Sequence, residues 1–381
     1  MAVPAVTLRK KLARAIRQGH PWVYRDALDA PTGLADGQLV TVVERDGRRL
    51  ACGFWDGSGP IAVRILDLQP VKDAPGLIAQ RLREALGKRL ARLDPAQTNT
   101  FRWVHGEGDR LPGIHVDLYA GVAVVRFDGA GARAFYGDLR STLSTCASPL
   151  RLDAILDRQQ RRADVPPIQV VENGIRFWVD LGQGQKGGLF LDQRENRLAV
   201  AARSAGQRVL NLFGYTGAFS LYAAKAGARR TDTVDAARPA IEAARRNFEL
   251  NDLPLAAAGL HATDAFEFLA AAAQRRDKWD VVISDPPSFA PSRHALPNAR
   301  RAYTRLHRMA AAVVAPRGLL CAASCSSHFA RDEFVASVKD GVARAGRRFV
   351  LESVSGPGFD HPTLPVFPEG DYLKFVMGRV E

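Results

Sequence analysis

Hydrophobic and polar positions alternate in short runs near the start of the chain, a pattern typical of strands with one buried face. The clearest runs cover residues 38–44, 50–55 and 61–66, and turn sequences rich in Asp and Gly separate them. A short helix is expected before them, at residues 8–18. We predict a small β-rich domain over residues 1–72.

A mixed pattern follows between residues 73 and 181. The sequence Asn173-Gly174 separates two β-rich runs, which strongly indicates a β-hairpin. We predict an α/β middle domain over residues 73–181 that ends in this hairpin. Its expected helices cover residues 77–93 and 132–145, and its expected strands cover 101–104, 114–118, 122–127, 152–156, 168–171 and 175–181.

Residues 182–381 alternate apolar runs of strand length with amphipathic runs of helix length. Repeated βα units predict a doubly wound sheet, in which ligands bind at the carboxyl ends of the strands. The expected strands are 208–212, 231–234, 259–262, 280–284, 318–323, 349–353 and 373–379. The expected helices are 218–226, 239–250, 265–274, 299–314 and 332–345.

The composition indicates what kind of partner the protein binds and in which compartment it is found. The chain has 53 Lys and Arg against 40 Asp and Glu, a net charge of +13 that favours a polyanionic partner. No apolar run reaches the roughly 18 residues of a membrane span, and the N-terminus has no signal-peptide pattern. The four cysteines show neither zinc nor disulfide spacing. We expect a cytoplasmic protein with no metal site and no membrane contact.

The most informative local motif is a strand, a glycine turn and a helix over residues 209–218. Gly214 and Gly217 allow a tight turn and a close approach of the backbone to a ligand. The G-x-G-x-x-G motif that holds a pyrophosphate at a helix N-terminus is missing. A ligand without phosphates therefore fits this turn better than a dinucleotide.

Acidic residues follow three successive strands of the predicted sheet. Asp235 could accept hydrogen bonds from ribose hydroxyls, and Asp264 could accept one from an adenine amino group. Asp285 follows the fourth strand and begins the sequence Asp-Pro-Pro-Ser-Phe. Three acids at one sheet edge are a more specific signal than any single one, since a lone strand-end Asp is usually a helix N-cap.

These motifs resemble a class I S-adenosylmethionine-dependent methyltransferase. Nearly the whole chain is similar to the bacterial and archaeal family of large-subunit ribosomal RNA cytosine-5 methyltransferases. That family has a PUA domain, a small α/β middle domain and a Rossmann-like catalytic domain over residues that correspond here to 182–381. The motifs that carry the resemblance are Glu107–Asp117, Gly187–Arg194, Asn211–Gly217, Asp285–Phe289, Ser324-Cys325-Ser326 and His361–Glu369.

The resemblance implies a seven-stranded sheet with S-adenosylmethionine at its carboxyl edge. It also implies large-subunit ribosomal RNA as the partner, and a homodimer is one assembly that we leave open. It assigns Asp235 to the ribose hydroxyls and Asp264 to the adenine. The other implied cofactor residues are Asn211, Phe213, Gly214, Tyr215, Thr216, Gly217 and Asp285. A groove for cofactor or RNA would be lined by Lys186, Asp192, Arg194, Pro286 and Pro287. For Lys186 and Arg194, a solvated charge between domains is the alternative.

The chemistry that the resemblance implies needs a thiolate, because cytosine C5 accepts a methyl group only after a nucleophile has added to C6. Cys325 follows a predicted strand at the ligand edge and is the candidate nucleophile, whereas Cys321 within that strand is expected to be buried. Asp285 would hydrogen-bond and protonate N3 of an unstacked base. A positive charge would favour the thiolate, and the cofactor sulfonium, Lys186 and His328 are candidates.

Two other functions remain open. Amino-methylating and guanine-methylating enzymes of the same fold also use an Asp-Pro-Pro motif followed by an aromatic residue, but they need no thiol, so Cys325 favours cytosine-5. The second alternative is a non-catalytic RNA-binding protein, against which the complete acid set argues. In the first domain, Trp22 and Tyr24 either stack on bases or belong to the core.

Overall fold

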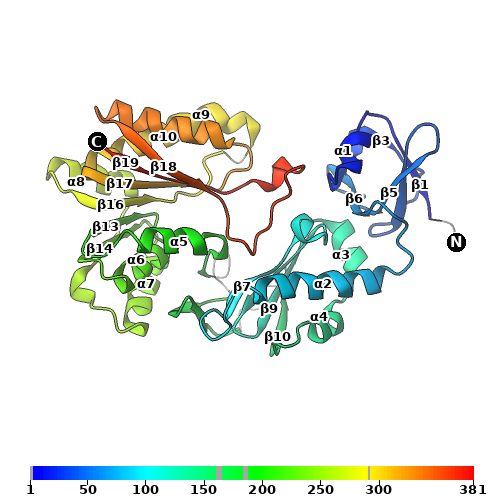
Figure 1. Ribbon diagram of the computed structural model, residues 1–381, viewed down its shortest axis with the longest axis horizontal. Helices are drawn as coiled ribbons and strands as arrows, with labels where there is room; N and C mark the ends of the chain where they lie inside the picture. Colours follow the sequence, from blue (N-terminus) through cyan, green and yellow to red (C-terminus); the bar gives the residue numbers. More distant parts are fainter. Residues whose placement is uncertain (1–2, 160–164, 183–187, 291) are drawn as a thin grey trace. The chain divides into compact units, whose positions relative to one another are not determined.

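The computed structural model describes residues 3–159, 165–182, 188–290 and 292–381. The chain divides into two compact units, which Figure 1 colours along the sequence. Unit 1 comprises residues 1–162 and 359–370, and unit 2 comprises residues 163–358 and 371–381. The chain therefore passes between the units three times.

The first part of unit 1 is a six-stranded sheet in the order β2-β6-β5-β4-β1-β3. Alternate residues of β4, such as Val40 and Val42, are fully buried, as the alternating pattern predicts, whereas β5 is buried continuously from Leu50 to Trp55. The helix predicted at residues 8–18 is too long, because Leu8 ends strand β1 and only five residues are helical. The elements are β1 (Ala5–Leu8), α1 (Ala13–Arg17), β2 (Trp22–Tyr24), β3 (Leu28–Asp29), β4 (Leu39–Val43), β5 (Arg49–Trp55) and β6 (Ile61–Asp67).

A second sheet of unit 1 has the order β10-β9-β8-β7. The single helix predicted at residues 132–145 is wrong: it is two helices, because the chain turns at Gly137, whose φ is +56°. Asp73 caps helix α2 by accepting a hydrogen bond from the Gly76 N–H at 3.0 Å. The elements are α2 (Ala74–Leu90), β7 (Thr100–His105), β8 (Ile114–Tyr119), β9 (Val122–Phe127), α3 (Ala130–Tyr136), α4 (Arg140–Cys146) and β10 (Ala154–Asp157).

Residues 359–370 are distant in sequence from the rest of unit 1 but pack tightly within it. The Asp360 carbonyl accepts a hydrogen bond from Arg89 at 2.7 Å, and its carboxylate accepts one from the Arg102 N–H at 2.9 Å. The ring of Phe367 meets the edge of Trp22 with centroids 4.5 Å apart. Trp22 is thus engaged in packing, which favours the core interpretation over base stacking.

Unit 2 contains a seven-stranded sheet in the order β15-β14-β13-β16-β17-β19-β18, which confirms the predicted fold. The sheet is parallel except for β19, which runs antiparallel between β17 and β18. Its strands are β13 (Arg208–Leu212), β14 (Arg230–Asp235), β15 (Ala258–Ala262), β16 (Trp279–Ser284), β17 (Val314–Ser324), β18 (Phe349–Ser355) and β19 (Lys374–Val380).

Helices cover both faces of this sheet. Figure 1 shows α8, α9 and α10 on one face and α5, α6 and α7 on the other. Neighbouring residues of β13 point to opposite faces, so that Val209 packs on the α6 side and Leu210 packs on the α9 side. The remaining elements of unit 2 are β11 (Ile168–Glu172), β12 (Ile175–Val179), α5 (Arg194–Ala201), α6 (Ala218–Lys225), α7 (Arg238–Leu250), α8 (Ala265–Gln274), α9 (Leu296–Val313) and α10 (Arg331–Arg344). No helix among the described residues is both long enough and apolar enough to cross a membrane.

The order of the strands identifies where a ligand binds. From β13 the chain builds outward through β14 and β15, and then returns to place β16 and β17 on the other side of β13. Leu212 and Ser284, the last residues of β13 and β16, pair with each other at this switch point. In open α/β sheets, ligands bind in the crevice outside the carboxyl ends of the strands at such a point.

Candidate active site

The loop after β13 has an unusual backbone. Phe213 and Tyr215 have φ angles of +55° and +48°, and Gly217 has a φ of +81°. Positive φ is costly for residues with a side chain, and it persists at sites where the surroundings enforce it. Gly214 is enclosed as well, since a Cβ at this position would lie 2.5 Å from a methyl carbon of Thr233. A strained loop at the switch point is a candidate ligand cradle.

Asp235 at the end of β14 supports this loop. One carboxylate oxygen accepts a hydrogen bond from the Tyr215 N–H at 2.9 Å, and the other accepts one from the Ala237 N–H at 2.9 Å. Each carboxylate oxygen can accept more than one hydrogen bond, so capacity for a ligand remains. Asp235 therefore lies beside the loop, as its predicted role in holding a ribose requires.

Asp264 lies after the end of β15 and is exposed. One of its oxygens accepts hydrogen bonds from the N–H groups of Phe266 and Glu267 at 2.8 and 3.2 Å, so the residue is the N-cap of α8. The second oxygen accepts no hydrogen bond among the described residues. The adenine contact of Asp264 stays a prediction.

Asn211 in β13 is buried beneath the loop. Its side-chain N–H donates to the hydroxyl of Ser220 at 3.1 Å, but its side-chain oxygen has no partner among the described residues. An unsatisfied buried acceptor costs about 1–3 kcal/mol. A donor that reaches Asn211 from a ligand would relieve this cost.

Residues 188–194 pack on the same loop. The Thr216 hydroxyl donates to the Gly188 carbonyl at 3.0 Å, and the ring of Phe190 meets Tyr215 with centroids 5.6 Å apart. In the predicted groove, Asp192 accepts a hydrogen bond from the Tyr372 hydroxyl at 2.8 Å. Arg194 is buried and contacts Glu195, which argues against a solvated charge. Lys186 lies outside the described residues.

Asp285 begins the segment after β16, with Pro286 buried and Pro287 exposed. Its carboxylate accepts a hydrogen bond from the side-chain amide of Gln193 at 2.9 Å. Gln193 in turn accepts one from Asn196 at 2.7 Å. The sequence analysis did not single out Gln193, because an amide between charged neighbours has no spacing signal.

Cys325 lies directly after β17 and is partly exposed, at the same sheet edge as Asp285. Before it, the Ser324 hydroxyl is hydrogen-bonded to the Tyr303 hydroxyl at 2.9 Å. Burial, together with the charges of Cys325 and Asp285, raises the pKa of Tyr303 to about 12. Tyr303 of α9 is therefore electrostatically coupled to both predicted catalytic residues, and its phenol remains neutral at physiological pH.

Cys321 occupies a different environment four residues earlier. It is fully buried within β17, and burial raises the pKa of its thiol. A buried neutral thiol is inert toward a substrate in solution. Cys321 lies within β17 and Cys325 follows it, and of these two cysteines only Cys325 lies at the sheet edge where a ligand would bind.

A buried ion pair supports the hairpin and the groove. The guanidinium of Arg197 in α5 makes three hydrogen bonds of 2.6–3.0 Å to the carboxylate of Glu172 in β11. Tyr222 of α6 donates to the same carboxylate at 2.8 Å, and Arg197 also donates to the Phe190 carbonyl at 3.0 Å. The pair thus connects the hairpin, two helices and the segment that packs on the loop.

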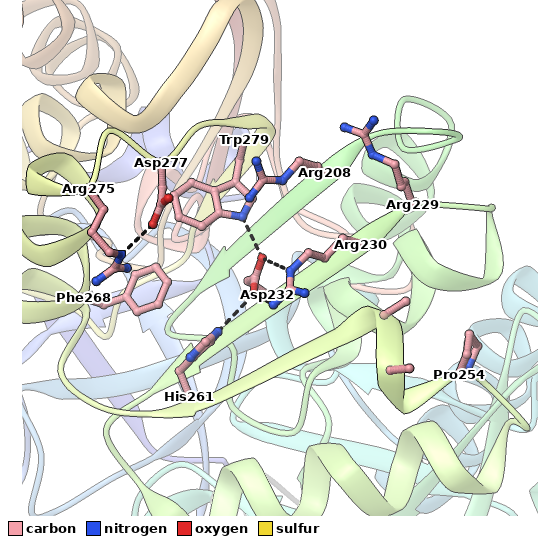
Figure 2. A pocket seen from close by; sticks show the side chains of 12 residues that line it. Arg208, Arg229, Arg230, Asp232, Pro254, His261, Phe268, Arg275, Asp277 and Trp279 are labelled. Atoms are coloured by element: carbon pink, nitrogen blue, oxygen red, sulfur yellow. Dashed lines mark hydrogen bonds and ion pairs between the residues drawn. The ribbon is translucent and has the colours of Figure 1, made fainter.

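A large cavity of about 680 Å³ lies at the opposite edge of the sheet (Figure 2). Arg208, Arg230 and Trp279, the first residues of β13, β14 and β16, line it. Its buried carboxylate, Asp232, accepts hydrogen bonds from Arg230, His261 and Trp279 at 2.8–3.1 Å. This network satisfies the acid internally, and the amino ends of strands are not where such sheets bind substrates. We therefore assign the cavity a structural role.

Comparisons with known proteins agree with this architecture. A family model described as S-adenosylmethionine-dependent methyltransferase matches residues 163–357, and one described as PUA-like domain matches residues 6–68. A ribosomal RNA large subunit methyltransferase of Deinococcus radiodurans is 36% identical over 415 residues, covering 100% of both chains. The ribosomal RNA large subunit methyltransferase I of Salmonella arizonae is 33% identical over 397 residues, covering 99% of this chain and 98% of the relative.

Solved structures show the same fold over the full length. SMU.776, a protein described as a methyltransferase and complexed with SAH, superimposes with a TM-score of 0.86 at 23% identity, covering 100% of both chains. A protein from Streptococcus mutans described as SAM-dependent methyltransferase gives a TM-score of 0.85 at 22% identity, covering 99% of this chain and 100% of the other.

Proposed function

The chain belongs to the family of S-adenosylmethionine-dependent ribosomal RNA large subunit methyltransferases, and on that premise we propose that it methylates C5 of a cytosine in large-subunit ribosomal RNA. The observation that carries the cytosine-5 assignment is Cys325, a partly exposed thiol at the same sheet edge as Asp285. The proposed reaction passes through a transient bond between the Cys325 sulfur and C6 of the base.

The residues at the switch point fit the cofactor. Asp235 would accept hydrogen bonds from the ribose hydroxyls, and the unsatisfied oxygen of Asn211 would accept one from the amino group of the methionyl moiety. The absence of a side chain at Gly214 and Gly217 lets this loop pack closely on Thr233 and on Ala244, which holds its backbone at the switch point. When bound, S-adenosylmethionine supplies the methyl group as an electrophile.

The chain's own residues would perform the remaining chemistry. The Cys325 thiolate adds to C6, and Asp285 donates a proton to N3 as electrons move into the ring. This addition makes C5 a nucleophile. After C5 has taken the methyl group, the C5 proton passes to a base such as water and the S–C6 bond breaks. The N3 proton returns to Asp285, which restores the neutral aromatic base and the free thiolate. Gln193 orients Asp285 through its 2.9 Å hydrogen bond.

Methylation of a guanine or of an exocyclic amino group is the alternative that the same fold supports. Asp285, Pro286 and Pro287 suit that reaction as well, because the motif can hold an exocyclic nitrogen. That chemistry has no use for a thiol at the end of β17. The position of Cys325 favours cytosine-5.

The test is a trapping experiment with large-subunit RNA that contains 5-fluorocytosine. Fluorine replaces the C5 proton whose loss releases the enzyme, so we expect a covalent protein–RNA adduct that survives a denaturing gel and requires S-adenosylmethionine. RNA with unmodified cytosine is the control and should give methylated RNA without a stable adduct. Methylation of guanine, or methylation of the fluorinated RNA without any adduct, would overturn the cytosine-5 assignment.

Asp235→Ala is expected to weaken binding of S-adenosylmethionine about tenfold or more, because hydrogen bonds to a charged group contribute roughly 1.5–3 kcal/mol. Titration calorimetry measures this directly. Asp235→Asn keeps an acceptor for the Tyr215 N–H and should lose less affinity. Asp340→Ala, which removes an exposed carboxylate on α10, is the matched control and should bind as the wild type does. Equal affinity of Asp235→Ala and the wild type would exclude Asp235 from the cofactor site.

A further inference from the structure

Lys374 is a buried cation at the start of β19. Its residue is 1% exposed, and it pairs directly with Ser324, the last residue of β17, in the antiparallel register. Directly opposed residues of an antiparallel pair have their side chains on the same face. The Lys374 side chain therefore extends beside the end of β17, where Cys325 follows.

The hydrogen bonds of Lys374 are all to neutral groups. Its ammonium donates to the carbonyl of Ser326, the residue after Cys325, and to the carbonyls of Asp371 and Tyr372 at 3.2 and 3.3 Å. Among the described residues, no carboxylate lies within ion-pair distance of it. A buried charge without a counter-charge is costly, and proteins usually pair such groups.

The charges that face Lys374 come from several elements. Asp371 precedes β19 and Arg331 lies on α10, but these two residues pair with each other at 2.9 Å. Asp371 favours the ammonium and Arg331 opposes it, and the negative form of Cys325, which follows β17, favours it as well. Burial lowers the pKa of Lys374 to about 8, so the ammonium predominates at neutral pH.

Two further titratable groups belong to the surroundings of Cys325. Tyr303 on α9 has a phenol whose pKa burial raises to about 12, so it stays neutral over the pH range of interest. Asp285 after β16 is held by Gln193. Asp371 is shared with Arg331, so a Cys325 thiolate supplies Lys374 with a second counter-charge.

We propose that Lys374 is a positioning residue that holds Cys325 as a thiolate, through its positive charge and through its hydrogen bond to the Ser326 carbonyl. The thiol proton passes to solvent, and no co-reactant is needed. This inference rests on the proposed function, in which Cys325 is the nucleophile. Lys374 thus joins the cofactor sulfonium, Lys186 and His328 as a candidate charge for activating the thiol, and it is the one whose burial beside β17 the structure describes.

The pH profile of Cys325 alkylation tests the proposal without any methyl transfer. Full-length protein is treated with iodoacetamide between pH 6 and 10, and the Cys325 peptide is followed by mass spectrometry. In Lys374→Met, the midpoint of the profile should rise by about one pH unit, which slows alkylation about tenfold at pH 7. The rate above the midpoint should be unchanged, and Lys374→Arg, which keeps the charge, should stay near the wild-type midpoint.

A reciprocal measurement leaves the buried lysine in place, should Lys374→Met fail to fold. Because coupling between two sites is mutual, Cys325→Ser should lower the pH at which Lys374 titrates by about one unit. Carbon-13 NMR of labelled lysine follows this titration, with Arg331 left unaltered. An unchanged Cys325 midpoint in Lys374→Met, or an unchanged Lys374 titration in Cys325→Ser, overturns the inference.

These outcomes are independent of the trapping experiment. If 5-fluorocytosine RNA forms a covalent adduct but the titrations of Cys325 and Lys374 do not depend on each other, the proposed function stands. In that case Lys374 has no part in it. Linked titrations without an adduct would retain the Lys374–Cys325 pair and remove the cytosine-5 assignment.

Discussion

Cys325→Ala is expected to abolish methyl transfer to RNA, lowering the rate by roughly 10⁴-fold or more, as removal of a nucleophile does in other covalent enzymes. Binding of S-adenosylmethionine should change little, because the residues proposed to hold it lie at the ends of β13 and β14. The measurement is transfer of a labelled methyl group to large-subunit RNA, with titration calorimetry of the cofactor in parallel.

Cys321→Ala is the matched control for this variant. It removes a thiol from the same strand, but one that is fully buried and neutral. Methyl transfer should stay near the wild-type rate, and the free energy of unfolding should fall by about 1 kcal/mol through loss of packing. A normal rate in Cys325→Ala would end the cytosine-5 assignment and leave the amino or guanine alternative in its place.

Arg197→Ala should produce a large loss of stability. The variant leaves the carboxylate of Glu172, which is 0% exposed, without its cationic partner. Breaking a buried pair in this way costs about 3–5 kcal/mol. Chemical denaturation should show this as a lower free energy of unfolding, and cofactor affinity should fall as well, because Arg197 also holds the Phe190 carbonyl beside the loop.

Arg176→Ala provides the comparison within the same hairpin. Arg176 in β12 pairs with Asp252 at 2.9 Å, but the side chains are 46% and 89% exposed. Exposed pairs contribute at most about 1 kcal/mol, so this variant should unfold close to the wild type. If Arg197→Ala and Arg176→Ala unfold alike, the buried pair does not have the structural role that its geometry indicates.

Much of the architecture of unit 2 was predictable from local patterns. Apolar runs of strand length marked β13 and β16, and acidic residues at or just beyond the strand ends marked the ligand edge. These predictions succeed because a parallel strand covered on both faces is continuously apolar, and because polar residues begin where that cover ends. The assignment of individual contacts at that edge stays a prediction.

The supporting residues were not predictable in this way. Gln193, Tyr303 and Lys374 reach the site from segments far from Asp285 and Cys325 in sequence, so no spacing relates them. Lys374 in particular has the sequence context of an ordinary strand-end lysine. Its burial depends on the pairing of β19 between β17 and β18, which is a property of the assembled sheet.

Because the chain passes between the units three times, neither unit can fold completely early in synthesis. Multidomain chains generally fold unit by unit during synthesis, beginning with the N-terminal one. Here unit 1 needs residues 359–370, and the sheet of unit 2 needs β19 in its interior. Neither unit is complete while translation has not passed these segments. A nascent chain on a ribosome that stalls before residue 359 would therefore lack Lys374, the residue that lies beside Cys325. The newly made enzyme would become active only late in translation.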